Sequence, residues 1–238
     1  MAKFLVLLCL FVVVCYAAPT QVEASSSANK GNTESKLYHD LTANYEKFAR
    51  PVAHVDETVN VTFGLSLWYF RYCEKRKALY LNLWTQTGWK DINMKWDPSE
   101  YDGLTSSSFQ WDTVWTPDIT VFNSPNEDTY VLKPSTPVLA FSDGSMLNIN
   151  SHKVATYNCS TDSDDAETLM CTFKFGSWIH SGKKIDVHGG DLKTYLLDAQ
   201  KEQFVKHELR RIVAHYECCP EAYPRMEYYI WIKKNKND

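Results

Sequence analysis

V-N-V-T-F-G-L-S-L-W-Y, residues 59–69, places an apolar side chain at almost every second position. A period of two is typical of a half-buried antiparallel strand, one face of which packs on a core. The polar run E-K-R-K at 74–77 predicts a turn, and L-Y-L-N-L-W at 79–84 resumes the alternation. The two stretches therefore predict a pair of antiparallel strands joined by a short turn.

Similar short runs continue along the chain, and one helical pattern precedes them. In L-Y-H-D-L-T-A-N-Y-E-K-F the apolar residues fall at intervals of four, four and three, which predicts an amphipathic helix over 37–48, stopped by Pro51. One leading helix and about ten strands are typical of an all-β, immunoglobulin-like β-sandwich, here expected over residues 36–238. Further strands are expected at 138–150 around an S-D-G turn, at 171–178, at 205–216 and at 228–232, with Gly189-Gly190 between runs.

The N-terminal segment has the layout of a secretory signal peptide. Lys3 precedes an apolar run that ends in small residues, so we expect a signal peptide over residues 1–17 and a secreted, extracellular protein. Residues 18–35 are small and polar, which predicts a disordered leader. No second apolar run of membrane length follows, and the formal net charge of −4 argues against a nucleic-acid partner.

Cysteines and sequons fit an oxidising compartment. Cys159 and Cys171 enclose a polar loop that a local disulfide would close, and Cys218 and Cys219 are adjacent. A bridge between neighbours closes almost no chain, so its stabilising effect is small and another purpose is expected. Cys73 is then left over, as a buried free thiol in preference to an intermolecular bridge. Asn60-Val-Thr62 and Asn158-Cys-Ser160 are candidate glycosylation sites.

The sequence contains no recognisable catalytic or metal-binding motif. Its seven histidines are scattered, without the spacing of a metal site, and no nucleophile elbow or phosphate-binding glycine loop is present. The acidic string at 160–167 lacks the spacing of a calcium loop and favours a solvated turn. We therefore expect no enzyme activity, no metal and no cofactor.

Aromatic residues are abundant, with eight tryptophans and fourteen tyrosines. Most are expected in the core, but Phe122, Trp178, Tyr216 and Tyr223 stand beside turns. Aromatic faces around a small space attract a cation, each contact giving roughly 0.5 to 2 kcal/mol. A quaternary ammonium group suits such a cage because it offers no hydrogen bonds to a carboxylate site.

Four motifs carry a family resemblance: L-Y-H-D-L at 37–41, W-T-P-D at 115–118, G-S-W at 176–178 and Y-E-C-C-P-E-A-Y at 216–223. In this order they resemble the extracellular domain of the Cys-loop ligand-gated channels, and most of all their soluble relatives, the acetylcholine-binding proteins. The resemblance implies a homopentamer that binds a small cationic ligand, such as acetylcholine or a nicotine-like amine, between subunits. It also implies that the vicinal disulfide shapes a loop that closes over the ligand.

The resemblance assigns residues to two faces of each subunit. The principal face is expected at Phe122, Trp178, Tyr216, Cys218, Cys219 and Tyr223, and the complementary face at Trp84, Leu139, Leu147 and Ile149. The segment 191–198 is expected to be a variable loop beside the site. Phe122 stands where many members have tyrosine, which removes one hydrogen bond worth on the order of 1 kcal/mol.

The loop between Cys159 and Cys171 departs from the channel pattern, because it is shorter and polar. This favours a soluble protein with nothing beneath it to gate. Two alternatives remain at this stage. The chain is the ligand-binding domain of a channel subunit, or it is a secreted carbohydrate-binding protein or hydrolase that stacks sugars on its aromatic rings.

Overall fold

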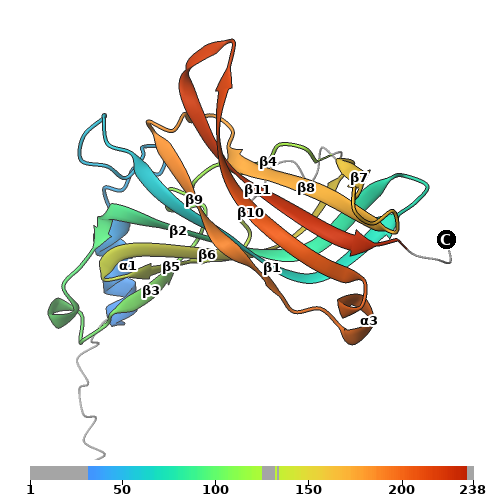
Figure 1. The fold of residues 1–238 in the computed structure, drawn as a ribbon. Helices are drawn as coiled ribbons and strands as arrows, with labels where there is room; N and C mark the ends of the chain where they lie inside the picture. Colours follow the sequence, from blue (N-terminus) through green and yellow to red (C-terminus); the bar gives the residue numbers. More distant parts are fainter. Residues whose placement is uncertain (1–31, 125–131, 133, 235–238) are drawn as a thin grey trace, which may run out of the picture. The chain divides into compact units, whose positions relative to one another are not determined.

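The computed structural model describes residues 32–124, 132 and 134–234 (Figure 1). The expected signal peptide at 1–17 and most of the expected leader, residues 18–31, lie outside the described residues. The elements in chain order are α1 (Thr33–Thr42), β1 (Val59–Cys73), β2 (Ala78–Lys95), the 3-10 turn η1 (Pro98–Glu100), β3 (Ser106–Phe109), β4 (Ile119–Val121), β5 (Val138–Phe141), β6 (Asp143–Thr156), β7 (Cys159–Thr161), β8 (Thr168–Ser177), β9 (Ile185–Thr194), α3 (Asp198–Lys201), β10 (Phe204–Tyr216) and β11 (Cys219–Lys233).

The described strands form two sheets, so the expected all-β sandwich is confirmed. The first sheet has the order β3-β5-β6-β2-β1-β9, and the second has the order β10-β11-β8-β4 with β7 paired to β8. The expected hairpin is present: β1 and β2 pair antiparallel from Thr62 opposite Gly88 to Cys73 opposite Ala78, around a turn at 74–77. Figure 1 shows the two layers, with the long β10 and β11 side by side in the second sheet.

The hydrophobic core lies between the sheets. The ring of Phe63 on β1 is 5.1 Å from that of Phe175 on β8, which in turn contacts Tyr228 on β11 edge-on at 5.6 Å. The buried Tyr228 hydroxyl donates to the carbonyl oxygens of Phe63 and Gly190, at 3.0 and 2.9 Å. A tyrosine can therefore fill the core because its one polar atom is satisfied there.

The leading helix is displaced from its expected position. It begins at Thr33, capped by Asn32, so residues 33–35 form its first turn instead of the end of a leader. It ends at Thr42 and not near Pro51, because tertiary hydrogen bonds hold Tyr45 outside the helix. The Tyr45 hydroxyl donates to the buried Asp91 carboxylate at 2.5 Å and accepts from the Trp115 N–H. Phe48, expected on the buried face of a helix, is 85% exposed.

The expectation of a break at Gly189-Gly190 is wrong, because both glycines lie inside β9. Their role is close packing. A β-carbon on Gly189 would lie 2.5 Å from Met226 Cε, and one on Gly190 would lie 3.1 Å from the Gly64 Cα of the neighbouring β1. The expected variable loop at 191–198 likewise begins within β9 and ends at the first residue of α3.

Candidate functional site

A cavity of about 470 Å³ opens beside the β10–β11 hairpin, where β8 ends and the chain leaves β4. It brings together all six residues expected on the principal face. Its lining residues are Phe122, Asn123, Lys174, Ser177, Trp178, Tyr216, Cys218, Cys219, Tyr223 and Arg225.

The four aromatic rings of the cavity form two pairs. Phe122 and Trp178 have ring centroids 6.0 Å apart and inclined at 52°, and Tyr216 meets Tyr223 at 5.5 Å in an edge-on arrangement. Trp178 and Tyr216 are 58% and 45% exposed, which is unusual for rings of this size. Both pairs thus leave aromatic surface accessible to a ligand.

Asp118, the last residue of W-T-P-D, holds the segment that carries Trp178. Its carboxylate accepts hydrogen bonds from the Ser177 hydroxyl at 2.6 Å and from the N–H groups of Trp178 and Ile179 at 3.0 and 2.8 Å. β4 and β8 pair here, with Ile119 opposite Ser177. The motif therefore fixes the backbone on which the tryptophan stands.

The vicinal disulfide lies at the tip of the β10–β11 hairpin. Cys218 and Cys219 are bonded, and the register of the hairpin shifts between His215 and Tyr216, so that Tyr216 pairs with Cys219. β11 of this hairpin contacts the loop between β8 and β9 through a hydrogen bond from the Gly182 N–H to the Ala222 carbonyl at 2.8 Å. The disulfide is thus part of the cavity wall.

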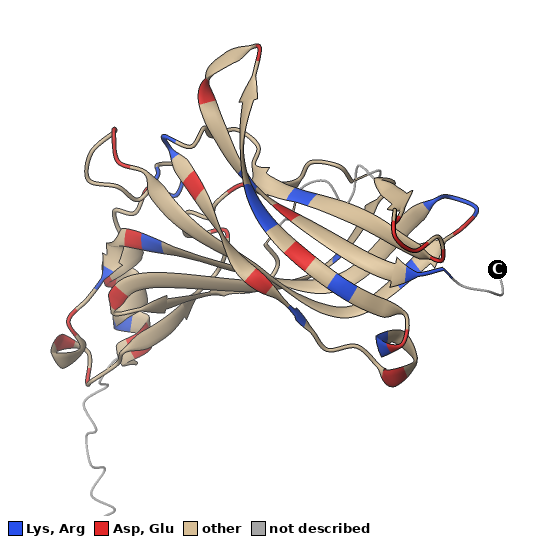
Figure 2. Cartoon of the chain, in the orientation of Figure 1, with Lys and Arg blue, Asp and Glu red and all other residues tan. Residues whose placement is uncertain are grey.

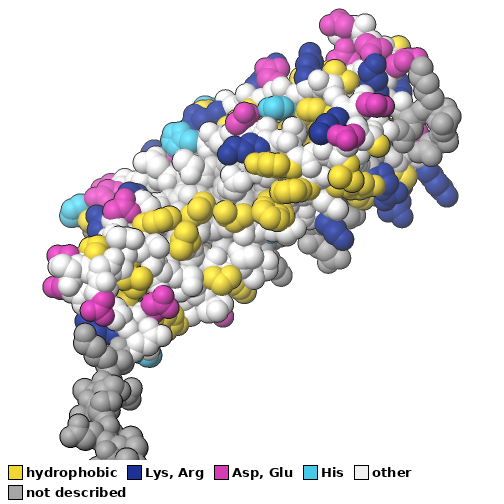
Figure 3. All heavy atoms as spheres, turned by 90° about the horizontal axis from the view of Figure 1, so that it is seen from below, with side chains coloured by type: hydrophobic (Ala, Val, Ile, Leu, Met, Phe, Trp, Pro, Cys, Tyr) yellow, Lys and Arg dark blue, Asp and Glu magenta, His cyan; other side chains and the backbone are white. Residues whose placement is uncertain are grey.

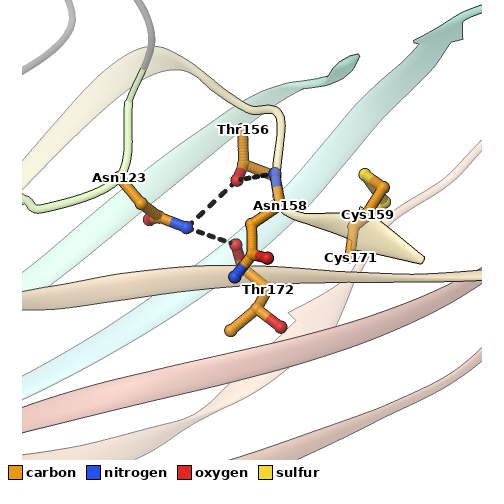
Figure 4. The surroundings of a disulfide bond; sticks show 6 residues. All are labelled: Asn123, Thr156, Asn158, Cys159, Cys171 and Thr172. Carbon is orange, nitrogen blue, oxygen red and sulfur yellow. Dashed lines mark hydrogen bonds between the residues drawn. A yellow bond between two sulfur atoms is a disulfide. The ribbon is translucent and has the colours of Figure 1, made fainter. Parts of the chain in front are cut away.

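Asn123, one of the residues that line the cavity, also lies close to the second disulfide (Figure 4). Its side-chain amide donates to the Thr156 hydroxyl at 3.0 Å and to the Thr172 carbonyl at 2.7 Å, next to the Cys159–Cys171 bond. Its amide oxygen accepts from the Lys174 N–H at 3.0 Å. Both expected disulfides are therefore present, and Cys73, outside them, is half-buried instead of buried.

The four expected complementary residues lie apart from this cavity, on the outward side of the six-stranded sheet. Trp84, Leu139 and Ile149 are each more than a third exposed, and Leu147 pairs with Leu139. Exposed apolar residues on a sheet face are typical of an interface. Figure 3 shows hydrophobic side chains gathered in a band across the face seen from below.

Two further rings beside Trp84 were not anticipated. Trp68 stacks on Tyr195 at 4.7 Å and is inclined to Trp84 at 5.1 Å. Trp68 follows the buried Leu67 on the outer face of β1, and the bulge between Leu67 and Tyr69 turns Tyr69 outward as well. The Tyr195 N–H donates to the Leu67 carbonyl. The sequence does not reveal this group, because Tyr195 lies far along the chain from Trp68 and meets it only in the fold.

Lys174, Arg225 and Glu227 form a charged group at the cavity, also missed by the sequence reading. Arg225 Nε and Nη2 both lie 2.7 Å from Glu227 Oε1, and Lys174 Nζ is 3.9 Å from the same oxygen. Burial raises the pKa of Glu227, but hydrogen bonds from Tyr229 and Arg225 outweigh it and hold that pKa below its ordinary value. Glu227 is therefore an ionised, nearly buried counter-ion.

The acidic string at 160–167 forms a self-capped turn. Asp162 accepts from the Asp164 N–H, and Asp165 accepts from the Glu167 N–H and the Thr168 hydroxyl. Within the described ranges no group of three or more His, Cys, Asp or Glu residues is placed to hold a metal. The two sequon residues, Asn60 and Asn158, are exposed, and their glycosylation stays a prediction.

The fold and the cavity define a class of protein, a β-sandwich that presents aromatic rings at its surface to a ligand. Residues 34–236 match the model of the neurotransmitter-gated ion-channel ligand binding domain, and the chain belongs to that family. The family and fold are those of ligand-binding receptor domains and not of enzymes.

Curated relatives include an alpha-type acr-16 acetylcholine receptor subunit of Caenorhabditis briggsae, 31% identical over 84% of this chain and 41% of the relative. The human neuronal acetylcholine receptor subunit alpha-9 is 27% identical over 96% of this chain and 48% of its own length. The chain thus spans about half the length of these relatives or less. Of the helices in the described residues, none has the length and apolarity needed to span a bilayer.

A similar solved structure is the Capitella teleta AChBP in complex with lobeline. It superposes with a TM-score of 0.73 at 24% identity, and the match covers 86% of this chain and 99% of that one. This structural similarity shows that the two proteins share a fold.

Proposed function

We propose that this protein is a secreted, soluble, homopentameric binding protein for acetylcholine and other cationic nicotinic ligands. The observation that carries the proposal is the convergence of Phe122, Trp178, Tyr216 and Tyr223 with the vicinal disulfide on one cavity, in a chain of this family. The protein binds and releases its ligand without chemical change.

The binding force in this proposal is cation–π attraction. The ammonium group sits against the open faces of Trp178 and its neighbours, where desolvation strengthens each contact. The Cys218–Cys219 ring stiffens the hairpin tip, so the hairpin moves as a unit over the ligand. The disulfide serves the geometry of the site more than the stability of the fold.

A second subunit completes the cage. Trp84, Leu139, Leu147 and Ile149 lie outside the cavity of their own chain, so we assign them to the cavity of a neighbour. A contact between two different faces repeats from chain to chain and closes into a ring. The number five rests on the family.

The main alternative is that the chain is the ligand-binding domain of a channel subunit. The curated receptor subunits, of which this chain spans 41% and 48%, favour it. A transcript that continues past Asp238 into apolar membrane spans would decide for it. The alternative of a secreted carbohydrate-binding protein or hydrolase is not favoured, because the chain matches a neurotransmitter ligand-binding domain and the family is not one of enzymes.

Co-assembly of two variant subunits, each defective in one face, tests whether neighbouring subunits form the binding site together. Trp178→Ala removes the principal ring and Trp84→Ala removes the complementary one, so each homomer is expected to lose about tenfold in choline affinity. Co-assembled in equal amounts, the two variants restore about a quarter of the interfaces, because each has an even chance of either intact face.

Calorimetry counts the restored sites, and light scattering gives the mass of each assembly. A monomeric mass, or mixed rings that recover no sites, would contradict the proposal. A mixture prepared from separately assembled, non-exchanging rings serves as the control and should recover none.

A further inference from the structure

The cavity contains two basic side chains although its rings suit a cation. Lys174 on β8 and Arg225 on β11 both line it, and no acidic side chain occurs among the described residues that do. Figure 2 shows that basic and acidic residues lie next to one another on the strands of the second sheet. A site for a plain cation gains nothing from positive charge in its wall, so this feature requires its own explanation.

Arg225 is fixed close to the aromatic rings. It pairs with Gly176 across the strands, and a β-carbon on Gly176 would lie 3.2 Å from Arg225 Cβ and 2.9 Å from Phe122 Cζ. Its Nη1 donates to the Tyr216 hydroxyl at 3.3 Å, and its Nε and Nη2 are held by Glu227. The guanidinium is therefore oriented by both a ring of the cage and a carboxylate.

Among the described residues, the charges of this group do not balance. Glu227 Oε1 accepts from Arg225, Glu227 Oε2 accepts from the Tyr229 hydroxyl at 2.6 Å, and Lys174 approaches only to 3.9 Å. Within the described part of the chain, one carboxylate thus faces both Lys174 and Arg225, whose side chains are 31% and 19% exposed, respectively. Partly buried charge without a full partner is costly, and an anionic group in the cavity would relieve that cost.

We infer that the preferred ligand is a zwitterion of the betaine class, with a carboxylate a short distance from its quaternary ammonium group. The ammonium group lies on the aromatic rings, and the carboxylate accepts charge-assisted hydrogen bonds from Arg225 and Lys174. This inference rests on the proposed function and narrows it. The ester carbonyl of acetylcholine accepts a hydrogen bond at the same place but leaves the excess positive charge uncompensated.

Three probes separate the parts of the ligand: tetramethylammonium, choline and glycine betaine. Choline and glycine betaine share the trimethylammonium head. Where choline has a hydroxymethyl group, glycine betaine has a carboxylate. Calorimetry on the assembled wild-type protein is expected to show glycine betaine binding about tenfold more tightly than choline. Arg225→Gln should abolish this preference, so that the ratio of glycine betaine affinity to choline affinity falls to about one.

Lys174→Gln is the second variant, because it leaves the Arg225–Glu227 pair intact and so preserves the fold if Arg225→Gln does not. It is expected to lower the ratio of glycine betaine affinity to choline affinity severalfold. Arg76→Gln, an exposed basic residue in the β1–β2 turn that bonds to Tyr80, is the matched control and should change nothing.

The outcomes distinguish the two proposals. If tetramethylammonium and choline bind but glycine betaine is no tighter, or if both variants keep the wild-type ratio, the zwitterion inference is overturned and the proposed function stands. If none of the three probes binds the assembled protein, the proposed function itself fails.

Discussion

The Asp118 carboxylate holds the backbone of Trp178: one of its oxygens accepts the N–H groups of Trp178 and Ile179, at 3.0 and 2.8 Å. The other accepts the Ser177 hydroxyl at 2.6 Å. Asp118 is therefore a positioning residue, since it touches the segment that carries the ring and does not line the cavity.

Asp118→Ala is expected to loosen this segment. Losing charge-assisted hydrogen bonds to two N–H groups and a hydroxyl should lower the free energy of unfolding by about 1–3 kcal/mol. Choline affinity should fall about tenfold, because Trp178 no longer keeps one orientation. Urea unfolding and calorimetry measure the two effects, with the exposed Asp112→Ala as control. Unchanged affinity would show that the ring is oriented by other contacts.

Gly176→Ala tests how tightly Phe122 is packed into the cavity wall. The new methyl group would meet Phe122 Cζ at 2.9 Å, so the ring must shift from its place in the cavity wall. Overpacking of this kind typically costs about 1–3 kcal/mol, and we expect a severalfold loss of choline affinity. The effect should be smaller in a Phe122→Leu background, which a double-mutant cycle would measure. Additive effects would argue against the contact.

The two disulfides should differ in what they contribute. Replacing both Cys218 and Cys219 by serine is expected to weaken ligand binding about tenfold with little change in the urea midpoint, because the bond closes almost no chain. Replacing Cys159 and Cys171, separated by 12 positions, should cost roughly 3 kcal/mol of stability by loop entropy. A large fall in stability for the vicinal pair would mean that it has a structural role.

Glu227 should make the fold sensitive to acid. Burial opposes ionisation, but Tyr229 and Arg225 hold the native pKa of Glu227 below its ordinary value of 4.5. The pairing therefore stabilises the fold above the unfolded pKa, and this contribution disappears as the pH falls through the native pKa. Glu227→Gln should be less stable than wild type at neutral pH, and the gap should close in acid. A gap that does not depend on pH would contradict this.

The sequence predicted the sandwich well because alternation over long strands reports burial directly. It placed the helix wrongly because a tertiary bond, from Tyr45 to Asp91, overrides local periodicity. Gly189-Gly190 looked like a loop, since the pattern does not show that another strand and Met226 approach those positions closely.

The principal residues were predicted from the family resemblance that W-T-P-D, G-S-W and the adjacent-cysteine motif carry. Lys174 and Arg225 were overlooked because a lone basic residue in a strand gives no sign of the cavity that it faces. Trp68 was not assigned to the site, because its stacking partner Tyr195 reaches it only through folding. Contacts between distant segments therefore define the part of the site that the sequence did not reveal.

The central claim is that aromatic rings hold a positive charge, and a neutral isostere of choline tests it most directly. In 3,3-dimethylbutan-1-ol a carbon atom replaces the nitrogen, so shape and apolar area are kept and the charge is lost. Calorimetry on the assembled protein should show choline binding at least about tenfold more tightly than this alcohol, with the difference abolished in Trp178→Ala. Equal affinities for choline and the alcohol in the wild-type protein would contradict the account.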